Sequence, residues 1–264
     1  MQDKAFIRPL PASFIELQSV DSTNNYALSR IRDGQAEHGS AYFAHEQTAG
    51  KGQRGRNWAS QKGANIALSI ALKPQPLLVS EQFQLSACVA VAVQKFFSRY
   101  AGTDTKIKWP NDLYWQDRKA GGILIESIVG SPESGVKTGE QQAEWKWAVA
   151  GIGININQTE FASELLNPVS LKQITGRNFD TVLLAKELYE LVKTQFTLLI
   201  NEGFQVIYKE YNDCLYKRNE PVKLKKNNAA FVTTVKGVST TGQLITQNNN
   251  LESAFEFGEV AWII

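Results

Sequence analysis

The pattern of hydrophobic and polar positions separates the chain into a long first region and a short second region. In the first region, segments with apolar residues at helical spacing alternate with short apolar runs. The clearest helix is expected over 181–201, with Asp180 as its N-cap. A second long helix is expected from Ser80, as its N-cap, to about residue 100, and a shorter helix begins near Ser22.

Seven short apolar runs in the first region predict strands. They cover residues 14–17, 41–45, 65–72, 107–109, 113–115, 122–129 and 145–156. The polar segment 130–144 contains glycine and serine and is expected to be an exposed hairpin loop. Helices around a sheet whose strands mostly follow one another in sequence indicate an α/β or α+β domain.

The pattern changes near residue 216, where short strand-like runs are separated by turns that contain asparagine and glycine. These runs lie at 221–224, 230–235, 244–246 and 254–257. Hairpins of this kind predict a small β-barrel module. We therefore expect two domains, one over residues 1–215 and one over residues 216–264.

Composition narrows the possible partners and locations. Hydrophobic residues make up 43% of the 264 positions and the formal net charge is only +2, so a packed core is expected and nucleic acid is not. Cys88 and Cys214 are too few for a disulfide framework, and His38 and His45 alone exclude a histidine-rich metal centre. No apolar run is long enough to cross a membrane, so a cytoplasmic protein without a membrane partner is expected.

The segment 46–58 combines three glycines, three cations and a tryptophan. These residues are Gly50, Gly52, Gly55, Lys51, Arg54, Arg56 and Trp58. Glycines allow a backbone to approach a ligand closely, and cationic donors suit phosphate groups. The segment therefore predicts a site for an anionic ligand, with a nucleotide as the first candidate. A solvated surface loop without a ligand is the alternative interpretation.

A dinucleotide-binding fold explains the same glycines less well. Gly50, Gly52 and Gly55 match G-x-G-x-x-G, but that fingerprint requires an acidic residue about 20 positions later. Residues 70–80 contain no acid, and no Walker string occurs in the sequence.

Four further strings accompany the glycine segment. They are DSTN at 21–24, KWPND at 108–112, KAGGILIE at 119–126 and AGIGININ at 150–157. In this order and spacing, the five strings resemble the biotin–protein ligase family over nearly the whole chain from about residue 14. The sequence is similar to the short form without an N-terminal DNA-binding domain, since only about 13 residues precede the first expected strand.

The resemblance implies both a fold and an activity. The implied fold is α+β, with an α/β-type mixed sheet as in class II aminoacyl-tRNA synthetases and an SH3-like β-barrel at the C-terminal end. Family members activate biotin with ATP to biotinyl-5′-AMP and then transfer biotin to a lysine of a biotin carboxyl carrier protein domain. Biotin, ATP and Mg²⁺ are therefore the implied ligands, without a fixed metal site on the protein.

The resemblance assigns charge and nucleotide contacts to particular residues. Arg54, Arg56 and Lys119 would offset the repulsion between the biotin carboxylate and the α-phosphate. The resemblance also implies that Asn111 and Asn155 bind ATP and the adenylate. An ordinary surface lysine after a turn at 116–118 is the alternative interpretation of Lys119.

The resemblance also implies a biotin-binding set of polar residues and glycines. The set is Ser22, Thr23, Gln47, Gly50, Lys51, Gln53, Trp58, Gly121, Gly122, Gly151 and Gly153. Ser22 and Thr23 have an alternative role as N-cap residues of the first helix. Trp58 has an alternative role in the core at the base of the loop, and the glycines could mark β-bulges.

Asp112 is implied as the group that orients the target lysine and receives its proton. A lysine with a pKa near 10.4 is mostly protonated at neutral pH, so its attack on the adenylate needs such a base. A turn residue before the strand at 113–115 is the alternative interpretation of Asp112.

Two positions depart from the loop pattern GRGRRGRxW that is familiar in this family. Lys51 and Gln53 stand where that pattern has arginines, so one planar donor and one charge are lost. We therefore predict that this chain releases biotinyl-AMP faster than relatives with arginine at these positions. Residues 50–57 carry few apolar anchors, and we expect them to be mobile until ligands bind.

Two other functions remain open on the sequence alone. A lipoate–protein ligase would share the general fold and perform the same type of acyl transfer. A non-catalytic biotin-binding or nucleic-acid-binding regulator belongs to a different class, and the near-neutral charge argues against its nucleic-acid form. A monomer and a homodimer are both compatible with the sequence.

Overall fold

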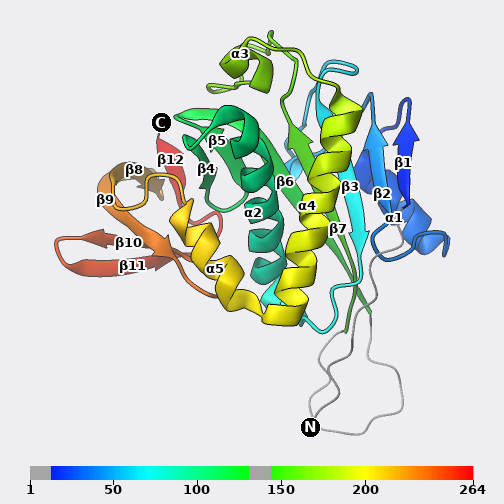
Figure 1. Cartoon of the computed structure of the whole chain (residues 1–264). Helices are drawn as coiled ribbons and strands as arrows, with labels where there is room; N and C mark the ends of the chain where they lie inside the picture. The colour runs from blue at the N-terminus through cyan, green and yellow to red at the C-terminus, as the bar shows by residue number, and fades with distance from the viewer. Residues whose placement is uncertain (1–12, 131–143, 264) are drawn as a thin grey trace, which may run out of the picture.

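The computed structural model describes residues 13–130 and 144–263. Two sheets form its framework, and the long helices lie on one face of the larger sheet (Figure 1). The loop expected over 130–144 lies almost entirely outside the described residues. Among the described helices, none is long and apolar enough to cross a membrane.

The larger sheet has seven strands in the order β1-β2-β3-β7-β6-β5-β4. β1 and β2 are parallel and the other neighbours are antiparallel, so the sheet is mixed. All seven expected strands are present, with ends that differ by a few residues. They are β1 (Phe14–Leu17), β2 (Ala41–Ala44), β3 (Ile66–Leu72), β4 (Thr105–Lys108), β5 (Asp112–Trp115), β6 (Arg118–Gly130) and β7 (Glu144–Ile154).

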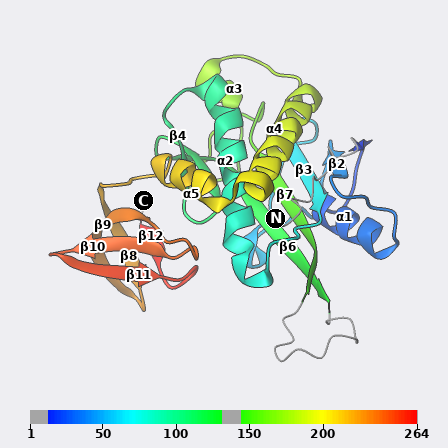
Figure 2. The ribbon, with the colours of Figure 1, turned by 60° about the horizontal axis from the view of Figure 1, so that its bottom comes forward.

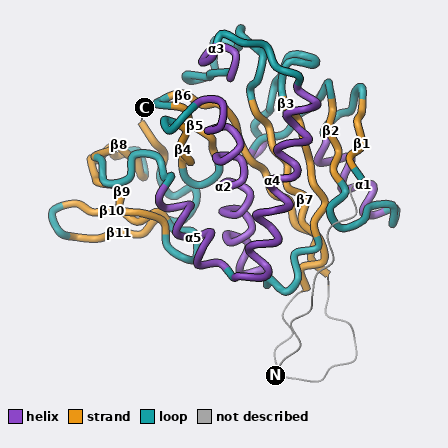
Figure 3. Tube along the Cα trace, viewed as in Figure 1, coloured by secondary structure: helices purple, strands orange, loops and turns teal. Residues whose placement is uncertain are grey.

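Helices cover both faces of this sheet. They are α1 (Thr23–Arg32), α2 (Gln82–Ala101), α3 (Leu171–Thr175), α4 (Thr181–Glu202) and α5 (Phe204–Asp213). α2 and α4 pack side by side on the face that is nearer the viewer in Figure 3. α1 packs on the other face, where Ala27 meets Tyr42, Ala71 and Val149. Because both of its faces are covered, β3 is buried at every position.

The two long helices begin differently. Asp180 caps α4 as expected, and its Oδ1 accepts hydrogen bonds of 2.9 and 3.0 Å from the second and third backbone nitrogens after it. The expectation that Ser80 caps α2 is wrong. A 3₁₀ turn, η2 (Val79–Glu81), precedes the helix, and Glu81 Oε2 accepts a hydrogen bond from Leu78 N at 2.8 Å. The N-cap position of α2 falls on Glu81, and no side chain caps the helix there.

The second sheet is antiparallel, with five strands in the order β11-β10-β9-β8-β12. They are β8 (Pro221–Lys226), β9 (Ala229–Val238), β10 (Leu244–Asn248), β11 (Leu251–Phe255) and β12 (Ala261–Ile263). The strand expected over 254–257 is displaced, because β11 starts directly after the turn that joins it to β10. β12 was not expected, since three residues show no useful alternation.

Pairs of asparagines form the tight turns of the second sheet. Asn227 and Asn228 join β8 to β9 with φ of 47° and 65°, and Asn249 and Asn250 join β10 to β11 with φ of 46° and 65°. A positive φ at both positions is typical of a type I′ hairpin turn, and asparagine tolerates it better than most residues. The expectation of turns at these asparagines is confirmed.

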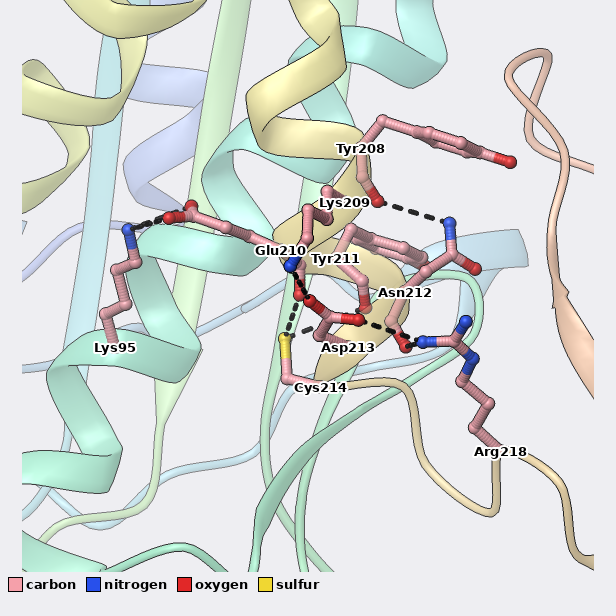
Figure 4. Close-up of polar contacts among 9 residues, drawn as sticks. All are labelled: Lys95, Tyr208, Lys209, Glu210, Tyr211, Asn212, Asp213, Cys214 and Arg218. Carbon is pink, nitrogen blue, oxygen red and sulfur yellow. Dashed lines mark hydrogen bonds and ion pairs between the residues drawn. The ribbon is translucent and has the colours of Figure 1, made fainter.

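α5 connects the two sheets (Figure 4). On one side, Glu210 forms an ion pair with Lys95 of α2 at 2.8 Å. On the other side, Asn212 Oδ1 accepts a hydrogen bond from Val238 N at 2.8 Å, and the Tyr208 hydroxyl donates to the Val238 carbonyl at 2.8 Å. Figure 2 shows the second sheet beside α5, on one side of the larger sheet. These contacts fix the second sheet to the helical layer.

Candidate active site

The glycine-rich segment 46–58 connects β2 to β3 and folds over β7. A Cβ at Gly50 would lie 2.3 Å from the Trp58 carbonyl oxygen, and a Cβ at Gly153 would lie 2.5 Å from the Trp58 indole. Neither distance is possible for a real side chain, so the packing of Trp58 requires glycine at both positions. This steric requirement, rather than a β-bulge, accounts for Gly153.

A buried polar network lies at the N-terminal end of α1. Gln47 Oε1 accepts two hydrogen bonds from Thr23, one from its backbone nitrogen at 2.8 Å and one from its hydroxyl at 3.1 Å. Ser69 Oγ of β3 lies 2.7 Å from Thr23 Oγ1 and 2.6 Å from Asn24 Oδ1. Ser22 stands at the N-cap position but makes no capping bond through its side chain. Ser22 is therefore the N-cap residue by position, as the alternative expected, while Gln47 accepts the first helical N–H in place of the Ser22 side chain.

Asn24 links this network to two further strands. Its Nδ2 donates to Glu126 Oε2 of β6 at 2.7 Å. A Cβ at Gly151 of β7 would lie 2.2 Å from Asn24 Oδ1, so Asn24 fills the space that a side chain at 151 would need. Asn24, Ser69 and Glu126 were missed as site residues. Ser69 interrupts the apolar run 66–72, and the other two belong to strings that carried the resemblance, so signals for all three existed.

Two polar atoms of the loop are buried without a hydrogen-bond partner in the described part of the chain. They are Gln53 Oε1 and Trp58 Nε1. A buried polar atom without a partner costs about 1–3 kcal/mol, so such atoms are rare unless a ligand or water satisfies them. One acceptor and one donor are therefore available in the segment that the sequence assigned to ligand binding.

Lys119 of β6 and Asp112 of β5 form an ion pair across the two strands, with 2.6 Å between Nζ and Oδ1. The backbone of Lys119 is fixed on both sides, since its nitrogen donates to Asn167 O and its carbonyl accepts from Val169 N, each at 2.8 Å. The sequence assigned the two side chains to different steps of a reaction, and the structure brings them together. An anion that binds Lys119 would therefore lie beside the Asp112 carboxylate.

The two glycines after Lys119 differ in their surroundings. A Cβ at Gly121 would lie 2.8 Å from the Gly153 carbonyl oxygen, which is too close. A Cβ at Gly122 would lie 3.5 Å from Asp112 Oδ1 and 3.7 Å from the end of Lys119, which is ordinary contact. Packing within the protein therefore requires Gly121, whereas Gly122 leaves open the space beside the ion pair.

Lys108 is a further cation that the sequence analysis missed. It is only 9% exposed and lies opposite Asp112 in the β4–β5 register. Its Nζ lies 3.2 Å from the Tyr114 hydroxyl and 5.3 Å from the centroid of the Trp262 ring. Burial lowers the pKa of Lys108 to about 8, and neighbouring cations act in the same direction against the opposing effect of Asp112. Its place as the first residue of KWPND was the available signal.

The cations of the glycine loop contact separate parts of the molecule. Lys51 Nζ donates a hydrogen bond to Asn25 Oδ1 of α1 at 2.5 Å. Arg54 reaches the second sheet, where its Nη2 donates to the Phe257 carbonyl at 3.1 Å. Arg56 is exposed, and its charge is one of those that lower the pKa of Lys108. The structure thus holds Lys51 against α1 and Arg54 against the second sheet, and leaves Arg56 exposed.

Asn111 and Asn155 are both buried and both bind backbone carbonyls. Asn111 Nδ2 donates to Ile123 O at 2.5 Å, and Asn155 Nδ2 donates to Val169 O at 3.2 Å. Val169 in turn donates its N–H to the Lys119 carbonyl. The two residues implied on the nucleotide side therefore stabilise the strand that carries Lys119.

Comparison with known proteins first gives the class of the chain. The family described as "Biotin/lipoate A/B protein ligase family" matches residues 16–139. A biotin protein ligase from Aquifex aeolicus, solved in complex with biotin and ATP, superimposes with a TM-score of 0.77 at 24% identity and covers 96% of this chain and 99% of its own. This likeness establishes a shared fold.

Sequence relatives then give the family. The biotin–[acetyl-CoA-carboxylase] ligase of Paracoccus denitrificans is 32% identical over 240 residues, which cover 87% of this chain and 92% of the relative. The bifunctional ligase/repressor BirA of Escherichia coli is 30% identical over 249 residues, which cover 93% of this chain and 72% of the relative. The chain therefore belongs to the biotin–protein ligase family and is a ligase. The resemblance inferred from the five strings is confirmed.

Proposed function

We propose that this chain activates biotin with ATP as biotinyl-5′-AMP and transfers biotin to a lysine of a biotin carboxyl carrier protein domain. One continuous line of contacts carries the proposal. Trp58 lies against Gly153, Gly153 faces Gly122 in the β6–β7 register, and Gly122 borders the Lys119–Asp112 pair. A flat ligand held under the loop therefore extends directly toward a cation and a carboxylate.

The biotin end of the ligand would be recognised by polar groups in and beside the buried network. Gln47 uses its oxygen for Thr23, which leaves its amide Nε2 to donate to a ureido oxygen. The implied contacts are Ser22, Thr23, Gln47, Gly50, Lys51, Gln53, Trp58, Gly121, Gly122, Gly151 and Gly153. A ligand polar group buried here without partners would cost about 1–3 kcal/mol, so these donors and acceptors favour one ligand chemistry.

In the first step, a biotin carboxylate oxygen bonds to the α-phosphorus of ATP and the bond to pyrophosphate breaks. Lys119, Arg54 and Arg56 would offset the charge that gathers around the α-phosphate. Asn111 and Asn155 would act on this side as well, through the strand that they stabilise. Mg²⁺ would arrive with ATP and offset phosphate charge. Among the described residues, no group of three or more His, Cys, Asp or Glu side chains is placed to hold a metal ion.

In the second step, the amine of the target lysine attacks the biotinyl carbonyl carbon and AMP leaves with the electrons of the broken C–O bond. The amine must lose a proton, and Asp112 is the nearby carboxylate that would receive it. Asp112 is paired with Lys119 in the structure, at 2.6 Å. Binding of the adenylate to Lys119 would free Asp112 for this task.

We also propose that residues 1–215 form a catalytic domain of the class II aminoacyl-tRNA-synthetase type and residues 216–264 an SH3-like barrel. Five short antiparallel strands joined mostly by tight turns support the second assignment. The mixed sheet covered by helices on both faces supports the first.

The test is an assay of the purified chain with ATP, Mg²⁺ and an unmodified carrier domain, given either biotin or lipoate. We expect an adenylate and a modified carrier lysine with biotin, observed by mass spectrometry, and neither product with lipoate. Modification with lipoate alone would assign the chain to the other branch of its family. Binding of biotin without any adenylate would identify a non-catalytic regulator.

A further inference from the structure

The side chain of Arg54 leaves the glycine loop and lies in a turn of the second sheet. That turn, residues 256–260, connects β11 to β12. Arg54 Nη2 donates to the Phe257 carbonyl at 3.1 Å, and the guanidinium carbon lies 4.6 Å from the centroid of the Phe257 ring. The two residues therefore make a hydrogen bond and a cation–π contact at the same time.

Gly258 leaves the space that Arg54 occupies. A Cβ at Gly258 would lie 1.2 Å from Arg54 Nη2, so any other residue would displace the guanidinium. Gly258 also has φ of 90° and Arg54 has φ of 56°, in the left-handed region. A bulky residue such as arginine is uncommon in that region, so its backbone is held in an unfavourable conformation at the point where it reaches the turn.

Phe257 also contacts the segment that carries the proposed base. Its ring packs edge-on against Trp109, with 6.2 Å between centroids and 81° between planes. Trp109 Nε1 donates to Gly242 O of the second sheet at 2.8 Å. Trp109 lies three residues before Asp112. A single aromatic ring of the second sheet thus joins the cationic loop to KWPND.

We propose that Phe257 and Gly258 form a cradle that positions Arg54 for adenylate formation, so that the second sheet is part of the active site. The proposal rests on the proposed function, because it takes Arg54 as a phosphate-binding residue. A guanidinium has five N–H donors, and the cradle uses one donor and one face. The remaining donors stay available for phosphate oxygens while the cradle fixes their direction.

A double-mutant cycle tests the cradle on the full chain. Phe257→Ala should lower kcat/KM for ATP in biotin-dependent pyrophosphate exchange by roughly fivefold, the effect of losing one exposed cation–π contact. The dissociation constant for biotin should change less than about twofold, because the buried network is untouched. In an Arg54→Ala background, Phe257→Ala should have no further effect. Phe257→Tyr should restore activity, since it keeps the ring.

Two further variants complete the test, one as a control for general damage to the second sheet and one as an independent way to displace Arg54. Leu251→Ala removes a side chain that is 74% exposed on β11, in the same sheet, and should leave kcat/KM unchanged. Gly258→Ala inserts a methyl group where the guanidinium lies and also strains the backbone at φ of 90°, so it should lower kcat/KM clearly more when Arg54 is present than with Arg54→Ala. This second route tests the cradle even if Phe257→Ala fails to fold.

The outcomes separate the cradle from the proposed function. Suppose that the wild-type chain catalyses biotin-dependent pyrophosphate exchange, and that Phe257→Ala lowers kcat/KM equally with Arg54 and with Arg54→Ala. This result would overturn the cradle alone, because the ring would then have only a structural role. Full activity of both Phe257→Ala and Gly258→Ala would also overturn it. A wild-type chain without biotin-dependent exchange would overturn the proposed function and the cradle with it.

Discussion

The biotin side and the phosphate side of the proposed site are built in opposite ways. On the biotin side, Thr23, Asn24 and Ser69 are almost fully buried and hydrogen-bonded across α1 and β3. On the phosphate side, most of residues 51–57 are exposed, and Lys51 and Arg54 contact different parts of the molecule. One side is a closed network, and the other is a set of exposed cations, each held by few contacts.

The difference shows how the two tasks of the site are divided. Buried groups that satisfy one another are costly to rearrange, so the recognition side keeps its shape before a ligand arrives. Exposed single contacts are worth about 0–1 kcal/mol, so anionic phosphates can redirect a cation such as Lys51, whereas Arg54 is held by the proposed cradle. Substitutions on the two sides should therefore change different steps.

The largest effect is expected for Lys119→Ala. Removal of a fixed positive group at a developing charge should lower biotin-dependent pyrophosphate exchange by about 10²–10³-fold. Biotin affinity should change far less, because the buried network does not include Lys119. Lys223→Ala, at an exposed position of β8, is the matched control and should exchange at the wild-type rate. Near-normal exchange by Lys119→Ala would refute its proposed role.

Asp112→Asn should separate transfer from activation. The substitution keeps size and removes the proton acceptor, so transfer from preformed biotinyl-AMP to the carrier lysine should slow by about 10²-fold or more. Formation of the adenylate should slow less. Rapid-quench single-turnover measurements of both steps check this, with Asp117→Asn in the neighbouring turn as the control. Equal losses in the two steps would argue against a role for Asp112 specific to transfer.

Gly153→Ala should act on the recognition side. The added methyl group would lie 2.5 Å from the Trp58 indole and force it away from β7. Overpacking of this kind costs about 1–3 kcal/mol, so biotin should bind roughly tenfold more weakly or worse, as measured by calorimetry. Gly34→Asn is the control, because Gly34 has φ of 68° and open space around it. Unchanged affinity of Gly153→Ala would mean that Trp58 does not cover biotin.

Gln53→Arg should strengthen the binding of biotinyl-AMP on the phosphate side. Gln53 makes only a long contact of 3.5 Å with the Ile123 carbonyl, so little is lost on replacement. A restored cation should slow the release of biotinyl-AMP by about three- to tenfold, as expected for one charge-assisted contact. Gln205→Arg adds the same charge at an exposed site of α5. Equal rates of biotinyl-AMP release from the wild type and from Gln53→Arg would contradict this prediction.

The smallest effect is expected in stability. Burial lowers the pKa of Lys108 from 10.5 to about 8, so the unfolded chain binds more protons than the folded chain between these values. Stability from this group therefore rises as the pH rises from about 8 to 10.5, and the full penalty applies below pH 8. Lys108→Met should be more stable at pH 7 by about 1–3 kcal/mol. Denaturant titrations should show this advantage shrinking toward pH 10.5, and a constant difference would contradict it.

Much of the fold followed from local signals in the sequence. The apolar run 66–72 predicted β3, and the helical spacing after Asp180 predicted α4 with its cap. The prediction of Ser80 as the cap was wrong because a 3₁₀ turn over Val79–Glu81 moves the N-cap position of α2 to Glu81. β11 was displaced because the pairing of strands depends on where a turn falls, which apolar residues alone do not fix.

The site was predicted less completely, because its contacts join distant parts of the chain. Lys119 and Asp112 were both named, but their ion pair depends on the β5–β6 register. Ser69 interrupts an apolar run, but its partners Thr23 and Asn24 lie more than 40 positions away, so the run alone did not show what the serine binds. The contact from Arg54 to Phe257 spans 203 positions, and no spacing rule connects such residues.

Amide hydrogen exchange, followed before and after biotin and ATP are added, tests the division of the site most directly. Residues 22–24 and 66–70 should already be protected in the free chain and change little on binding. Residues 50–57 should exchange quickly in the free chain and become protected only with both ligands. The account would be contradicted if residues 50–57 were equally protected with and without ligands. It would also be contradicted if residues 22–24 became protected only after the ligands bind, because the recognition side would then not be preformed.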